Sequence, residues 1–277
     1  SQIRTRDLRI TLEHARELGF ETITTRQLVD FLDHNARIPQ RSLLLIVDDR
    51  RPGVIREHFW PYLEKFGWTV TLGWLIGDTD SKPASPLKNI PESYKTLWEQ
   101  MEAYNASGML DIQAHGYIHN INAGPDSTDD FLRHELFDSR TVLQEHFYCK
   151  DYATGQVKPD CQTDQPLAYI WPGGSFTRRA VEMARQAGYR VGFTINPRGP
   201  IQYNWIPLAE KTDPASPSWL PEVPAGDPLM TLPRYWSSDA AYRLDEVANI
   251  GEEAAAYARL NRDRELLYYD VVCQPVH

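Results

Sequence analysis

Hydrophobic and polar positions alternate along the chain in blocks that predict helices and strands in turn. Apolar residues three or four apart indicate amphipathic helices, whereas short apolar runs rich in β-branched or aromatic residues indicate strands. Helices are predicted over residues 5–18, 25–32, 54–66, 92–105, 129–147, 177–186 and 244–259. Strands are predicted over residues 20–24, 43–47, 68–76, 108–114, 167–171, 189–195 and 266–272. The chain therefore has the regular order of a protein that combines helices with a sheet.

The strand predicted over residues 43–47 carries two acids at its carboxyl end. A run of five apolar residues predicts a strand buried on both faces, and Asp48 and Asp49 follow it directly. Because removing an ionised acid from water is costly without a partner or a metal, the two acids indicate a site. A helix cap or a charged loop is the alternative that the acid pair alone leaves open.

A second predicted strand, residues 108–114, ends in histidines. His115 follows it directly and His119 comes four residues later. Histidines at this spacing share one face if the segment forms a helical turn. Two imidazoles and one carboxylate are typical of a catalytic divalent metal site that keeps an open coordination position. The two strand ends together therefore predict a metal centre.

The order of the elements also predicts the architecture. Strands that alternate with helices favour parallel strands inside an outer layer of helices. Parallel strands surrounded by helices can close into a (β/α) barrel. In such barrels the functional site lies where the carboxyl ends of the strands converge. The chain is therefore predicted to be an α/β protein with a distorted or incomplete (β/α) barrel of about seven parallel strands. It has no repeats and no linker that splits it, so residues 1–277 are interpreted as a single domain.

Composition limits the classes of partner. With 277 residues, 42% of them hydrophobic, the chain can bury a core of barrel size. A net charge of −9 argues against nucleic acid or an anionic membrane as the main partner. No apolar run approaches the roughly 18 residues of a membrane span. The first residues do not resemble a signal peptide, so we expect a mature or trimmed chain.

The three cysteines do not decide whether the protein functions in an oxidising or a reducing compartment. Cys149 and Cys161 flank a polar segment, where they either close a loop as a disulfide, which implies export, or remain two free thiols. Cys273 lies in an apolar run and is interpreted as a core residue.

Residues 196–233 form a long proline-rich segment without helical or strand periodicity. Compact domains usually keep such segments for function. Two interpretations are open for four tryptophans, Trp205 and Trp219 within this segment and Trp171 and Trp236 outside it. Either one of the four borders a binding cleft, because indole rings pack against the C–H faces of ligands, or all four form a satellite hydrophobic cluster.

Three motifs in order resemble those of the NodB-homology polysaccharide deacetylases, carbohydrate esterase family 4. They are Val47–Asp49, the segment of residues 107–119 that contains both histidines, and Trp171–Gly174. The segment Gly19–Thr24, set between two predicted helices, is similar to the branch that de-N-acetylates exported poly-N-acetylglucosamine. The resemblance covers nearly the whole chain and implies a distorted barrel with about seven strands.

The resemblance implies a division of labour at the strand ends. Asp49, His115 and His119 would hold one divalent metal ion, commonly zinc, and Asp48 would be the base that takes a proton from the attacking water. The chemistry agrees with that division, because one carboxylate lends charge to the metal while its neighbour stays free to accept a proton.

The resemblance further implies the substrate and its surroundings. The partner would be an N-acetylated polysaccharide or oligosaccharide that loses acetate, and the protein would be extracellular or on the cell surface. A backbone N–H of Gly173 or Gly174 suits stabilisation of the developing oxyanion. Trp171 and Trp236 are further candidates for contact with the glycan.

The sequence departs from the family pattern at several positions. The usual glycine after the two acids is Arg50, and the usual arginine and tyrosine of the third motif fall at Ile170 and Gly173. Arg234 is the candidate to replace that arginine from a later strand end, and an ordinary surface arginine is its alternative. The family's general acid is a histidine near the last strand, and His277 fits that role by position.

Two other functions compete with deacetylation. A catalytically silent relative that binds metal and glycan is expected if the general acid is missing. A barrel glycosidase needs two carboxylates on different strands about 5–10 Å apart. Adjacent Asp48 and Asp49 do not suit that chemistry, because successive strand side chains point to opposite faces.

Overall fold

The computed structural model describes residues 4–48, 55–76, 101–117, 123–150, 154–195, 227–235 and 237–268. Its contacts divide the chain into two compact units. One is Phe20–Trp236, which contains every described strand, and the other combines Ser1–Gly19 with Ser237–His277. The predicted helix at residues 92–105 is described only from residue 101, where the chain is helical.

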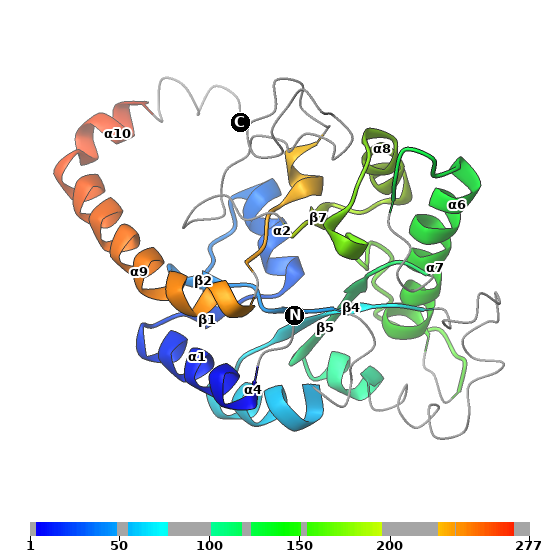
Figure 1. Ribbon diagram of the computed structural model, residues 1–277, viewed down its shortest axis with the longest axis horizontal. Helices are drawn as coiled ribbons and strands as arrows, with labels where there is room; N and C mark the ends of the chain where they lie inside the picture. Colours follow the sequence, from blue (N-terminus) through cyan, green and yellow to red (C-terminus); the bar gives the residue numbers. More distant parts are fainter. Residues whose placement is uncertain are drawn as a thin grey trace. The chain divides into compact units, whose positions relative to one another are not determined.

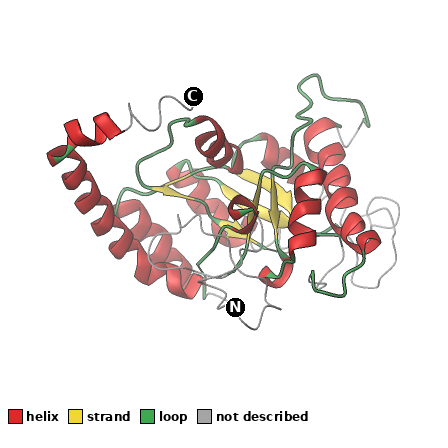
Figure 2. Cartoon of the chain, turned by 90° about the horizontal axis from the view of Figure 1, so that it is seen from above, coloured by secondary structure: helices red, strands yellow, loops and turns green. Residues whose placement is uncertain are grey.

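The strands of the larger unit are all parallel. Two form a small sheet, β1 (Glu21–Thr22) and β2 (Ser42–Leu43). Five form the main sheet in chain order: β3 (Ile46–Val47), β4 (Val70–Trp74), β5 (Leu110–Ala114), β6 (Ala168–Ile170) and β7 (Val191–Phe193). The helices of this unit lie outside the strands (Figure 2). The prediction of parallel strands inside a helical layer is therefore confirmed.

Two details of the strand prediction are wrong. The run over residues 43–47 divides between the two sheets and is half-buried, and β3 has β4 as its one neighbour among the described strands. The predicted strand over residues 266–272 begins inside a helix, α10 (Arg262–Tyr268). The periodicity of so short an apolar segment does not distinguish the two structures.

Helices follow the predicted positions with small shifts in their bounds. Those of the larger unit are α2 (Thr25–His34), η1 (Ile55–Phe59), α4 (Trp60–Phe66), α6 (Asp129–Arg133), η2 (His134–Asp138), α7 (Ser139–Leu143), η3 (Gln144–Cys149), η4 (Pro172–Gly174), α8 (Arg178–Ala187) and η5 (Pro228–Thr231). The terminal segments form α1 (Thr5–Glu17), α9 (Ser237–Leu260) and α10. Local sequence explains the start of α2, because Thr24 and Gln27 form a capping box there.

The main sheet is curled. The evidence is that its two edge strands contribute to one hydrophobic cluster. Val191 and Phe193 of β7 are buried in this cluster, and Ile46 of β3 packs against it. Val29 of α2 covers the same cluster. Edge strands of a flat five-stranded sheet are too far apart to share such contacts, since neighbouring strands lie about 4.8 Å apart. The sheet is therefore an open barrel.

The chain returns beside β7 after η5 and continues the barrel wall. The Leu232 N–H donates to the carbonyl oxygen of Gly192 at 2.8 Å, and the Thr194 N–H donates to that of Leu232 at 2.8 Å. Leu232 and Phe193 form a parallel bridge. Residues 233–235 consequently emerge at the carboxyl end of β7, at the same rim as the ends of the other strands.

Cys149 and Cys161 form a disulfide that links the end of η3 to the segment before β6. The free-thiol alternative is therefore wrong for this pair. Cys273 lies outside the described residues.

A buried polar network joins β5 to β6, where the ladder has one registered pair, Ala114 with Tyr169. Gln113 is fully buried, and its side-chain oxygen accepts the N–H groups of Leu167 and Ala168, both at 2.8 Å. Its amide nitrogen donates to the Asp111 carboxylate at 2.6 Å. The side chain thus replaces backbone hydrogen bonds between the two strands (β5 is labelled in Figure 1).

We predict that Gln113→Leu costs about 2–4 kcal/mol of unfolding free energy, because two buried N–H groups and one carboxylate lose a partner. Gln186→Leu on the exposed side of α8 is the control and should stay within about 0.5 kcal/mol of the parent. Denaturant unfolding of both variants measures the difference. Equal stability of the two variants would contradict the role given to Gln113.

Candidate active site

Asp48 and His115 follow directly after β3 and β5, at the same rim of the sheet. Gly73 of β4 lies between them. A Cβ placed on Gly73 would lie 3.6 Å from the Asp48 carboxylate and 3.4 Å from the Cβ of His115. It would lie 2.9 Å from the Cδ1 of Ile170, so a side chain there would crowd the site. Gly73 therefore provides the space in which the two polar side chains meet.

The structure brings Arg234 to Asp48. One guanidinium nitrogen, Nη1, donates to both carboxylate oxygens of Asp48, at 2.8 and 3.1 Å. The side chain of Arg234 is 14% exposed and that of Asp48 is 32% exposed. Burial to this degree reduces the screening that weakens ion pairs on open surfaces.

Arg234 is fixed at a second point. Its Nε donates to the carbonyl oxygen of Thr194 at 2.8 Å, just beyond the end of β7. Asp48 follows β3, the opposite edge strand of the main sheet. The guanidinium therefore bridges the two ends of the curled sheet, and it orients the carboxylate by hydrogen bonds as well as by charge.

His115 is buried, with 5% of its surface exposed. Its Nδ1 lies 2.7 Å from the carbonyl oxygen of Ile170 at the end of β6, and its backbone N–H donates to the Trp74 carbonyl oxygen. A carbonyl oxygen can only accept, so this contact places the ring proton on Nδ1. In the neutral ring Nε2 then carries the lone pair, as in histidines that ligate metals.

The two glycines after Trp171 differ in their availability. The Gly174 N–H donates to the Trp171 carbonyl oxygen at 2.8 Å, and Gly174 is buried with a positive φ of 66°. A Cβ on Gly174 would overlap Ile195, so the position requires glycine. Gly173 is exposed and also has a positive φ, 59°. Of the two amides, that of Gly173 is the one that suits an incoming oxyanion.

The assignment of Trp171 to glycan binding is wrong. Its side chain is 1% exposed, and its indole N–H donates to the Met230 carbonyl oxygen at 2.7 Å. Its ring packs against those of Tyr169 and Phe176. A buried indole with its donor satisfied stabilises the core, and no sugar can reach its face.

Several predicted site residues lie outside the described part of the chain. They are Asp49, His119, Trp205, Trp219, Trp236 and His277. Within the described ranges no three His, Cys, Asp or Glu side chains group closely enough to hold a metal ion. Of the three proposed metal ligands, His115 is the one that lies in those ranges.

Gly73 and the carbonyl of Ile170 are site features that the sequence analysis did not identify. A glycine inside a predicted strand often marks a close approach of other groups, and that signal is present at Gly73. A backbone carbonyl leaves no signal in the sequence, because every residue has one.

Comparison with known proteins identifies a family. A sequence profile described as polysaccharide deacetylase matches residues 35–192. The chain is 20% identical over 210 residues to the poly-beta-1,6-N-acetyl-D-glucosamine N-deacetylase of Escherichia coli O157:H7, and 19% identical to that of strain K12. The match covers 70% of this chain and 31% of each relative, so the chain spans about a third of their length.

Solved structures support the fold. IcaB from Ammonifex degensii superposes with a TM-score of 0.57 at 18% identity, over 89% of either chain. The deacetylase domain of BpsB from Bordetella bronchiseptica gives a TM-score of 0.54 at 19% identity, over 85% of this chain and 86% of that one. The distorted barrel expected from the resemblance is therefore confirmed.

We predict that Asp48 and Arg234 are energetically coupled. A double-mutant cycle with Asp48→Asn and Arg234→Met should give a coupling free energy of about 1 kcal/mol or more, because the pair is partly buried and shares two hydrogen bonds. The exposed pair Arg179 and Asp129 is the control and should couple more weakly. Additive effects of the two site substitutions on unfolding free energy would contradict the contact.

Proposed function

The chain belongs to the polysaccharide deacetylase family, and on that basis we propose that it hydrolyses N-acetyl groups of a polysaccharide that contains N-acetylglucosamine, with release of acetate. The observation that carries this proposal is the pairing of Asp48 with Arg234 beside His115 at the strand ends. The names of the Escherichia coli relatives support the choice of substrate class.

We assign one divalent metal ion, zinc in our proposal, to Asp49, His115 and His119. The proton on Nδ1 of His115 fits this assignment, because it places the lone pair on Nε2, the atom that would ligate the ion. Two imidazoles and one carboxylate also match the donor set of catalytic zinc sites. When bound, such an ion acts as a Lewis acid that polarises the acetamide carbonyl and makes water more acidic.

Asp48 is the general base in this proposal. Its carboxylate accepts a proton from the attacking water, and the two hydrogen bonds from Arg234 hold that carboxylate in a fixed orientation. The guanidinium also competes with a metal for the same oxygens. That competition supports a division in which Asp49 ligates and Asp48 accepts the proton.

The remaining roles fall on the rim of the barrel. The N–H of Gly173, an exposed residue, is our candidate donor to the developing oxyanion. His277 is our candidate for the general acid that protonates the leaving amine, and Trp236 our candidate for contact with the sugar. A chain without a working acid would bind metal and glycan yet release no acetate.

The disulfide supports a location outside the cytoplasm, since such bonds persist in oxidising compartments. We therefore propose an extracellular or cell-surface protein that acts on an exported glycan. Among the described residues, no helix has both the length and the apolar character needed to cross a bilayer.

Acetate release from β-1,6-linked N-acetylglucosamine oligomers by the zinc-loaded chain tests the activity. We predict that Asp48→Asn lowers the rate about 10²–10⁴-fold, because a positioned base contributes about that factor, and that it retains its zinc. Asp160→Asn, an exposed acid outside the site, is the control and should keep the parent's rate. A rate of Asp48→Asn close to that of the parent would rule out the assigned base.

Zinc content separates the ligands from the base. His115→Ala should weaken zinc binding by at least about 10–100-fold, because one of three protein ligands is lost. His14→Ala is the matched control, since His14 lies on α1 and contacts Asp245 of α9. Metal analysis after dialysis against a chelator measures both variants. Stoichiometric zinc in His115→Ala would show that the metal centre is misassigned.

A further inference from the structure

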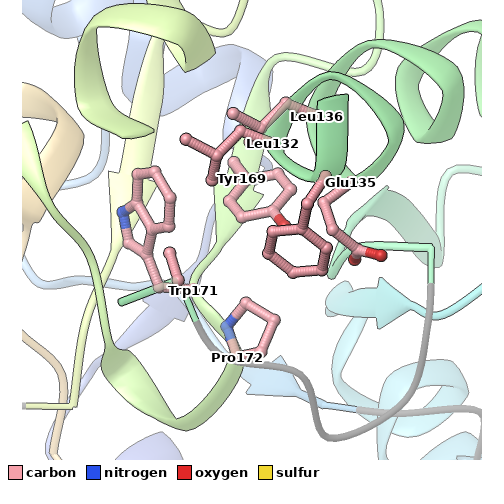
Figure 3. Close-up of a pocket in the computed structure, with 8 residues that line it drawn as sticks. Leu132, Glu135, Leu136, Tyr169, Trp171 and Pro172 are labelled. Atoms are coloured by element: carbon pink, nitrogen blue, oxygen red, sulfur yellow. The ribbon is translucent and has the colours of Figure 1, made fainter. Parts of the chain in front are cut away.

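Glu135 is a buried carboxylate on the helix that packs behind the site. It is 3% exposed and lines a small pocket with Leu132, Leu136, Trp171 and Pro172 (Figure 3). These four neighbours are mainly apolar, and Tyr169, whose hydroxyl lies near Gly116, also lines the pocket. A carboxylate in such surroundings is costly unless it is held by hydrogen bonds, so its partners indicate its role.

One partner of Glu135 is the backbone that follows the candidate metal ligand. Its Oε2 accepts the N–H of Tyr117 at 2.7 Å, two residues after His115. A carboxylate acceptor makes this a charge-assisted hydrogen bond, which is stronger than one between neutral groups.

Gly116 is shaped to admit that carboxylate. Its φ is 96°, which favours glycine, and a Cβ at this position would lie 2.6 Å from the Oε2 of Glu135. The hydroxyl of Tyr169 would lie 3.2 Å from the same Cβ. The absence of a side chain at residue 116 thus leaves the space that the carboxylate fills.

The helix holds Glu135 firmly in place. Ser139 Oγ donates to the carbonyl oxygen of Glu135 at 2.5 Å, and the Tyr189 hydroxyl donates to that of Leu136 at 3.0 Å. Glu135 lies in η2, a π-helical turn. The carboxylate is therefore presented from a fixed support.

We propose that Glu135 is a positioning residue that fixes the backbone after β5 and so holds His115 in the geometry that binds the metal. His115 is then fixed on two sides, by the Ile170 carbonyl at its ring and by Glu135 through the Tyr117 N–H. This inference rests on the proposed function, since it concerns the same metal centre.

Three substitutions of Glu135 separate the hydrogen bond from its surroundings. Glu135→Gln keeps an oxygen acceptor for the Tyr117 N–H, whereas Glu135→Met keeps the length, suits the apolar pocket and removes the acceptor. Glu135→Asp keeps the charge and shortens the reach. Glu145→Met, an exposed acid on η3 that pairs with Lys150, is the matched control.

The readouts are the zinc dissociation constant, measured by competition with a chromophoric chelator, and the kcat for acetate release. We expect Glu135→Met and Glu135→Asp to weaken zinc binding about 10–100-fold and to lower kcat, as loss of partners that orient metal ligands does. Glu135→Gln should bind zinc within about threefold of the parent, because a neutral acceptor retains the hydrogen bond. Glu145→Met should match the parent.

If Glu135 had a merely structural role, its substitutions would change the melting temperature of the zinc-free chain. Zinc affinity would then not show the pattern of loss in Glu135→Met and recovery in Glu135→Gln. Parent-like zinc affinity in folded Glu135→Met overturns the inference, and if that variant does not fold, parent-like affinity in Glu135→Asp does so. If the parent itself binds no zinc, the proposed function falls together with this inference. If the parent binds zinc and releases acetate while every Glu135 variant behaves alike, this inference alone falls.

Discussion

The ion pair between Asp48 and Arg234 connects the two edges of the five-stranded sheet, and the candidate site depends on it. Asp48 follows β3, whereas Arg234 comes from the segment that continues the wall beyond β7. Hydrophobic contacts curl the sheet, but they do not determine where a polar side chain points. The contact with Arg234 determines the direction of the Asp48 side chain. Nη1 of Arg234 donates to both carboxylate oxygens, while its Nε donates to the Thr194 carbonyl oxygen. This contact agrees with our proposal that Asp48 accepts a proton and Asp49 ligates the metal.

Around this pair, backbone groups do most of the positioning. The ring of His115 is oriented by the Ile170 carbonyl, and its main chain is fixed by Trp74 on one side and, through Tyr117, by Glu135 on the other. The absence of a side chain at Gly73 lets Asp48, His115 and Ile170 approach β4 closely. These contacts give the described part of the candidate site a rigid support.

The sequence predicted the parts of the fold and site that leave a local pattern. Parallel strands, the helices and the acid and histidine at two strand ends follow from periodicity and from the cost of burying charge, and Arg234 followed from a missing arginine at Ile170. Trp171 was misread, because a sequence does not reveal that an indole N–H finds a buried carbonyl oxygen. Gly73 and Glu135 act through neighbours that are distant in the chain, so local patterns could not assign their roles.

We propose that Arg234 keeps Asp48 off the proposed zinc ion and available as a base. An anomalous difference map at the zinc edge, from crystals of the zinc-loaded chain, tests it most directly. The account predicts a single peak within bonding distance of His115 Nε2, with Asp48 still hydrogen-bonded to Arg234. A zinc ion bonded to Asp48 in place of Arg234, or a peak away from the strand ends, would contradict it.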